Sequence, residues 1–235
     1  MLRQLPVALL ALAMTACAST IPHSSATPAP SHPSTPSATA TASASSAPDT
    51  EQVTVTASGV GAYDLQAYPV AVLHSQASAH IATGVVVGFT VDFPGGTYAL
   101  TAEPVLLAPG ETLAVTALCT DSCARATSTA VSVTVGGWEA GDRAVMTATS
   151  ATYACGSPCA GTIGYEGDVS ATLSGKVPSG TVLSLSAACE DSAGAIVGGG
   201  LMETVWPGGA SAVSSVPVLV STTPASCQLY ATELS

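Results

Sequence analysis

The second half of this chain repeats the pattern of the first half at a distance of 98 residues. The ungapped shift places residues 83–115 on residues 181–213, and it pairs Pro109-Gly110 with Pro207-Gly208. A competing shift of 70 residues pairs two cysteines but leaves these Pro-Gly turns unmatched, so we favour the longer period. A repeat of this length indicates one structural unit that occurs twice.

From Glu51 onward the sequence shows β-branched alternation, in which apolar and polar β-branched residues follow each other as in Val53-Thr54-Val55-Thr56, and glycines and prolines separate these runs. Only 8% of the residues are charged and 4% are aromatic, a composition that favours short strands over helices. We therefore predict an all-β fold with two tandem immunoglobulin-like (Ig-like) β-sandwich domains, at residues 51–140 and 141–235. Other strand candidates are residues 85–91, 112–116, 131–135, 145–147, 169–173, 182–187, 216–220 and 227–230.

The first 17 residues are organised like a bacterial export signal. Residues 1–4 carry one positive charge, residues 5–14 are apolar, and small residues follow. An apolar stretch this short cannot cross a membrane, which requires about 20 residues. Met14-Thr15-Ala16-Cys17 resembles the lipobox of bacterial lipoproteins, although Met14 stands where that family usually has Leu. The resemblance implies a lipid anchor on Cys17; ordinary cleavage after Ala18 is the alternative.

Residues 18–50 consist almost entirely of Ala, Ser, Thr and Pro. Such a segment cannot bury a hydrophobic core, so we predict a disordered linker. At roughly 3.1 Å per residue in the polyproline conformation, it would hold the folded part up to about 100 Å from a membrane.

Six cysteines remain when Cys17 is set aside, and an even number in an exported chain predicts disulfides. Among the possible pairings we favour Cys119 with Cys123, Cys155 with Cys159, and Cys189 with Cys227. The alternative is a zinc site built from the first two pairs, whose spacing permits it but whose oxidising compartment argues against it.

Charge and motifs exclude several classes of function. The formal net charge is -11 and the basic residues are Arg3, Arg125, Arg143 and Lys176, so there is no basic patch for nucleic acid. His74 and His80 are the histidines of the folded region, and no nucleophile elbow accompanies them, so we predict no catalytic site and no cofactor. Paired carboxylates could serve a glycosidase, but Glu166 with Asp168 and Glu190 with Asp191 are expected to be turn residues that border strands. A calcium site from Asp121, Glu190, Asp191 and Glu203 is the alternative to solvated carboxylates.

A strand, a glycine turn, a second strand and then Ala108-Pro109-Gly110-Glu111-Thr112 together resemble the FxLYD-type and related Ig-like domains of bacterial envelope lipoproteins. The chain has no Phe-x-Leu-Tyr-Asp string. The resemblance implies a secreted, membrane-anchored protein without enzymatic activity.

We therefore expect a lipid-anchored protein on the extracellular face of the cytoplasmic membrane, or a freely secreted one, with a binding or structural role at the cell envelope. Its partner would be an envelope or extracellular protein or glycan, contacted near residues 63–68, Trp138 and Trp206, unless these tryptophans fill the cores. The alternative is a secreted protein that binds a metal or small ligand.

Overall fold

The computed structural model describes residues 51–63, 65–120, 123, 125–156 and 165–234, and the regular secondary structure within these ranges is β-strand without helix. The all-β prediction is confirmed. The predicted signal and linker lie outside the described residues. The first half contains β1 (Val53–Tyr63), β2 (Gln66–Ser75), β3 (His80–Phe93), β4 (Gly96–Thr101), β5 (Val105–Leu107), β6 (Thr112–Thr116), β7 (Cys119–Thr120), β8 (Ser128–Thr134) and β9 (Gly137–Ala140). The second half contains β10 (Thr147–Cys155), β11 (Tyr165–Ser174), β12 (Val182–Glu190), β13 (Ile196–Val205), β14 (Ser211–Val220) and β15 (Ser226–Glu233).

The strands of the first half pair antiparallel in two groups. β1, β2 and β6 are neighbours in that order, and β7 also pairs with β2. The long strand β3 pairs with β4 and β5 and with β8 and β9. Leu73 and Leu113 from the first group meet Val87 and Phe89 from the second in a buried core. The alternating pattern of the sequence explains this, because every second side chain of a strand points to the same face.

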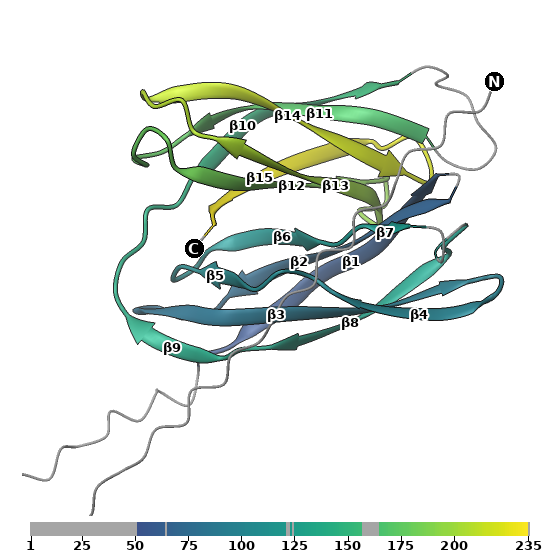
Figure 1. Cartoon of the computed structure of the whole chain (residues 1–235), viewed down its shortest axis with the longest axis horizontal. Coiled ribbons are helices and arrows are strands. Elements are labelled where there is room, and N and C mark those ends of the chain that lie inside the picture. Colours follow the sequence, from purple (N-terminus) through teal and green to yellow (C-terminus); the bar gives the residue numbers. More distant parts are fainter. Residues whose placement is uncertain (1–50, 64, 121–122, 124, 157–164, 235) are drawn as a thin grey trace, which may run out of the picture. The chain divides into compact units, whose positions relative to one another are not determined.

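The strands of the second half pair antiparallel in the order β10, β11, β14, β13, β12, β15. The contact between β13 and β14 consists of two residue pairs, Gly198 with Val220 and Gly199 with Leu219. A Cβ atom on Gly198 would collide with the backbone of β14, and one on Gly199 would collide with the backbone of Ala187 in β12, so glycine is required where β13 passes between its neighbours. In Figure 1, β10, β11 and β14 lie over β12, β13 and β15, and both groups contribute to a second core around Trp206.

Some strand pairings recur in both halves, although the described strands of the second half form one sheet and those of the first half form two. β1, β2 and β6 pair like β10, β11 and β14, and β3 corresponds to β12. Matching Pro-Gly turns precede β6 and β14. The competing 70-residue shift would place the short strand β7, which pairs with β2, on β12, which pairs with β13 and β15.

A third apolar cluster joins the two halves across the outer faces of β2, β6, β12 and β13, which lie in adjacent layers in Figure 1. Ser186 Oγ donates a hydrogen bond of 2.6 Å to the Ala114 carbonyl within this contact. Gly59 and Gly61 of β1 lie so close to Ile196 and Leu219 that a Cβ atom on either glycine would overlap the opposite backbone. The halves therefore contact each other along strands with small side chains. The members of the cluster are Val70, Val72, Ala114, Ala188 and Ile196, with Ala57 and Tyr230 beside them.

Candidate functional site

A groove runs between β10 and β15, the two strands that end the sheet of the second half. These strands lie side by side, yet the described ladders pair β10 with β11 and β15 with β12. The space between them measures about 580 Å³, which falls within the range of ligand-binding clefts. We refer to it as the β10–β15 groove. Its lining comprises residues 145–148, 150 and 151 at β10, residues 227–231 of β15, and residues 110–113 from the first half.

The register of β15 determines which of its backbone groups face the groove. In an antiparallel ladder, residues that do not bond to the neighbouring strand direct their N–H and C=O groups to the other side. The Leu234 N–H donates to the Val182 carbonyl at 3.1 Å, which makes that pair hydrogen-bonded. Alternation along the register then makes Cys227, Leu229 and Ala231 the non-bonded positions. The short Cα–Cα distance of 4.1 Å between Cys189 and Cys227 agrees with this assignment.

Arg143 supports this assignment at Glu233, the next non-bonded position of β15 after Ala231. Arg143 Nη2 donates to the Glu233 carbonyl at 3.0 Å and to Thr232 Oγ1 at 2.9 Å, and Nη1 donates to the Leu106 carbonyl at 3.1 Å. The Glu233 carbonyl is therefore satisfied by a side chain, whereas no described strand pairs with the edge at Cys227, Leu229 and Ala231. Arg143 also connects the two halves at this end of the groove.

The wall formed by β10 carries an irregularity. The register with β11 shifts between Thr149 and Thr152, and Ser150 has a φ of 57°, which is uncommon for a residue other than glycine. A bulge of this kind increases the local twist and prevents regular pairing along an edge. It explains why β10 does not form a ladder with β15 despite their proximity.

The groove carries little charge. Its ionisable side chains are Glu111 and Tyr230, because Cys227 is held in a disulfide and does not titrate. Burial raises the pKa of Glu111, while a hydrogen bond from Ala108 N–H (2.6 Å) and the Arg143 charge oppose the shift. Burial, assisted by the negative charge of Glu190, raises the pKa of Tyr230 to about 12. Apolar side chains such as Met146 and Leu229 provide much of the remaining surface.

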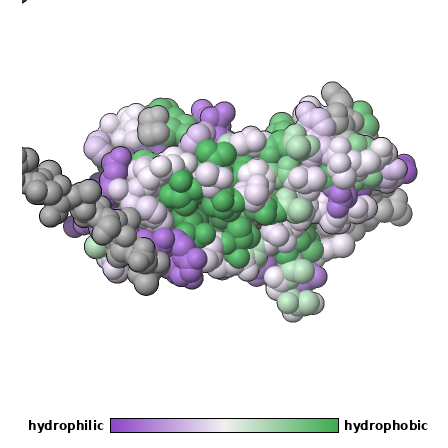
Figure 2. Space-filling view, turned by 90° about the horizontal axis from the view of Figure 1, so that it is seen from below, coloured by the Kyte–Doolittle hydropathy of each residue, from purple (hydrophilic) through white to green (hydrophobic). Residues whose placement is uncertain are grey.

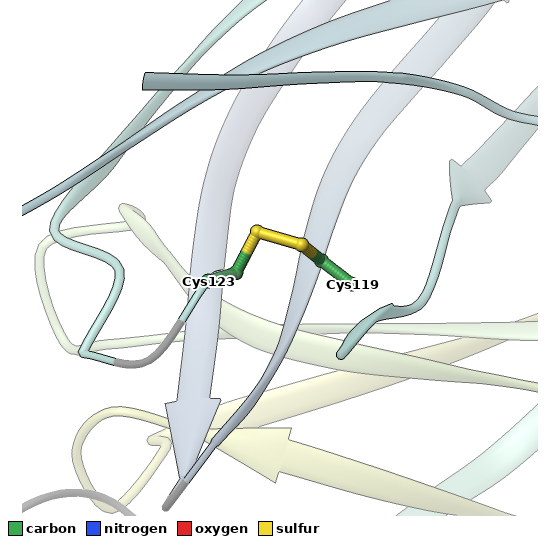
Figure 3. The surroundings of a disulfide bond; sticks show 2 residues. All are labelled: Cys119 and Cys123. Carbon is green, nitrogen blue, oxygen red and sulfur yellow. A yellow bond between two sulfur atoms is a disulfide. The ribbon is translucent and has the colours of Figure 1, made fainter. Parts of the chain in front are cut away.

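Two of the three predicted disulfides are present. Cys119 bonds to Cys123 beside the end of β7, as Figure 3 shows, and Cys189 bonds to Cys227 across β12 and β15. Cys159, the predicted partner of Cys155, lies outside the described residues, as does the predicted lipid attachment at Cys17. The Cys189–Cys227 bond fixes the β15 wall of the groove to the neighbouring strand β12.

The predicted contact residues are separate from the groove. Trp206 is completely buried and Trp138 packs against the first core, so both tryptophans contribute to the interior. Tyr63 and Tyr68 are half-buried, and burial raises the pKa of Tyr68. Tyr68 borders a separate hollow of about 300 Å³ together with Glu166 and Asp168.

The histidines and carboxylates have local structural contacts. His74 Nδ1 lies 3.1 Å from Thr112 Oγ1, and His80 Nδ1 lies 2.9 Å from the carboxylate of Glu51. Asp191 Oδ1 accepts hydrogen bonds from the N–H groups of Ala193 and Ala195, as expected for a turn residue. In the described ranges no three His, Cys, Asp or Glu side chains are arranged to hold a metal ion. Asp121, part of the alternative calcium set, lies outside these ranges.

Other surfaces give less indication of a ligand. A hollow of about 80 Å³ lies near Glu103, Glu203 and Glu233 at the contact between the halves. Figure 2 shows hydrophobic residues gathered on the face seen from below, where β3 and its neighbours form the outermost layer in Figure 1. Ile81 and Val86 of β3 are half-buried.

The groove could not be located from local sequence patterns, because its walls are far apart in the sequence and meet only through the order of the strands.

Comparisons with protein-family models, curated proteins and solved structures found no match. Within the described ranges there is also no helix long and apolar enough to cross a membrane.

Proposed function

We propose that this chain is a lipid-anchored protein of the bacterial cell envelope that carries two Ig-like sandwiches and binds another envelope or extracellular component without catalysing a reaction. The β10–β15 groove is the observation that carries this proposal. It combines a volume of about 580 Å³ with a backbone edge that no described strand pairs.

The strand order supports the Ig-like assignment. An Ig sandwich has strands A, B and E in one sheet and C and F in the other. β10, β11 and β14 correspond to A, B and E, while β12 and β15 correspond to C and F. In the first half β1, β2 and β6 correspond to A, B and E, while β3 and β8 correspond to C and F. This correspondence supports the proposal of two modules of the same kind.

The chemistry of the cysteines supports a location outside the cytoplasm. Disulfides persist in oxidising compartments, and the bonds Cys119–Cys123 and Cys189–Cys227 fit such a location. Cys17 precedes the linker and stands at the end of the lipobox-like tetrapeptide. A lipid attached there would place the folded modules beyond the membrane surface at the end of residues 18–50.

The test compares the native protein with a Cys17→Ala variant by intact mass and cell fractionation. We expect the native protein to begin at an acylated Cys17 and to remain with the membrane. The variant should lack the lipid mass and leave the membrane fraction. A native protein that is unacylated and released into the medium would refute the anchor.

A further inference from the structure

We propose that the β10–β15 groove receives an extended segment of a partner polypeptide, which adds to the open edge of β15 as a further strand. This inference rests on the proposed binding function and specifies its site and ligand class. The segment is neutral or basic and carries small apolar residues at alternate positions.

The backbone of β15 supplies the first argument. Cys227, Leu229 and Ala231 direct their N–H and C=O groups away from β12, and no described strand receives them. These residues are at most 9% exposed, so the polar groups lie in a largely enclosed position. Buried backbone groups require hydrogen-bond partners, and an added strand supplies donors and acceptors at the same spacing.

The topology supplies the second argument. In the Ig sandwich, strand F lies between strands C and G. β15 corresponds to F and has β12, the counterpart of C, on one side. The groove occupies the position of strand G on its other side. An incoming strand would therefore complete an arrangement that the fold already prepares.

Side chains and charge define the ligand. Met146, Ala148, Ala151 and Leu229 provide apolar contacts for alternate residues of an inserted strand. The carboxyl group of Glu111 lies at the groove in a chain of formal net charge -11, which disfavours an acidic segment. Residues 227–231 span about 17 Å at about 3.4 Å per residue, so the paired region is about five residues long.

Two threonines of β10 provide a matched pair of variants. Thr147 lines the groove, whereas Thr149 is absent from its lining. Both are exposed, and each donates a side-chain hydrogen bond to a backbone carbonyl of β11. Thr147→Trp should obstruct the groove, while Thr149→Trp adds the same bulk outside it. Val145→Trp, at a lining position that is 40% exposed, replaces the first variant if Thr147→Trp does not fold.

The experiment uses the full chain in detergent and a displayed library of short random peptides, followed by synthesis of the enriched peptides. We expect peptides with alternating small apolar residues to bind the wild-type protein and Thr149→Trp. Affinity for Thr147→Trp should fall at least about tenfold, equivalent to about 1.4 kcal/mol. Methylation of alternate backbone nitrogens in the peptide should also abolish binding, because it removes the donors of the added strand.

Several outcomes would overturn the inference. These are the absence of enriched peptides, equal binding to Thr147→Trp, and binding that survives backbone methylation. Self-association of the wild-type protein that Thr147→Trp abolishes would place a second copy in the groove instead of another polypeptide. None of these outcomes depends on acylation of Cys17, so failure of the groove assignment and failure of the lipid anchor are distinguishable.

Discussion

Glu111 is a buried carboxyl group at the β10–β15 groove, with 8% of its surface exposed. Its side chain accepts the Ala108 N–H and thereby holds the turn before β6. The sequence indicated this turn through Pro109-Gly110, but burial of the acid depends on the second half of the chain and is not visible in the local pattern.

The raised pKa of Glu111 predicts a pH-dependent stability. The folded protein holds the proton to higher pH than the unfolded chain, so ionisation lowers stability as pH rises from 4.5 through the folded pKa. Glu111→Gln keeps an acceptor for Ala108 without the charge. We expect the variant to gain stability over the wild type with rising pH, by about 1.4 kcal/mol per unit of pKa shift. Urea unfolding below pH 4.5 and at neutral pH measures this; a constant difference would contradict it.

Tyr230 gives a spectroscopic marker for the same region. Its hydroxyl donates to Gln228 Oε1 at 2.7 Å, and burial together with Glu190 raises its pKa to about 12. Ultraviolet titration of the wild-type protein should therefore show a phenol that ionises near pH 12. Tyr230→Phe should remove this step, and Tyr98→Phe, at an exposed tyrosine, should retain it. Persistence of the step in Tyr230→Phe would show that another residue causes it.

Strands were predictable where β-branched alternation is regular, and less so where alanine and serine replace it. Residues 227–230 lie within β15. The strand candidate at residues 145–147 shares only Thr147, the first residue of β10, with the observed strand. β10 consists largely of Ala, Ser and Thr and contains a bulge, so period-two alternation does not mark it. Strand pairing is set by contacts between distant segments, and for this reason the sequence did not reveal which strands are edges.

The two disulfides should differ in their contribution to stability. Cys189 and Cys227 are separated by 38 positions and Cys119 and Cys123 by 4, so the first bond restricts the unfolded chain more. Loop-closure entropy corresponds to about 4 kcal/mol for the longer loop and about 2 kcal/mol for the shorter. Denaturant unfolding of the two double alanine variants should show this order. The reverse order would mean that local contacts outweigh the entropy of the unfolded chain.

The whole molecule depends on close contact between its halves, which was not predicted from the sequence. The repeat indicated two similar units, but small residues in β1 gave no sign that they face the other half. Gly61 approaches the Leu219 backbone so closely that an added side chain must displace one of the two strands.

Gly61→Val should therefore weaken the contact between the halves. We expect a loss of at least about 1–3 kcal/mol, the usual cost of overpacking, and separate thermal transitions for the two halves. Ser58→Thr adds a methyl group at an exposed position of the same strand and should leave unfolding nearly unchanged. Calorimetry distinguishes these results; an unaltered single transition in Gly61→Val would contradict the observed contact.

β15 should have an open backbone edge in the groove of the free protein. Hydrogen exchange, resolved by residue, measures whether this edge is unpaired. We predict that the amides of Leu229 and Ala231 exchange faster than those of Gln228 and Tyr230, which bond to β12. Equally slow exchange at all four amides would mean that the edge is already paired, and it would contradict the proposed addition of a partner strand.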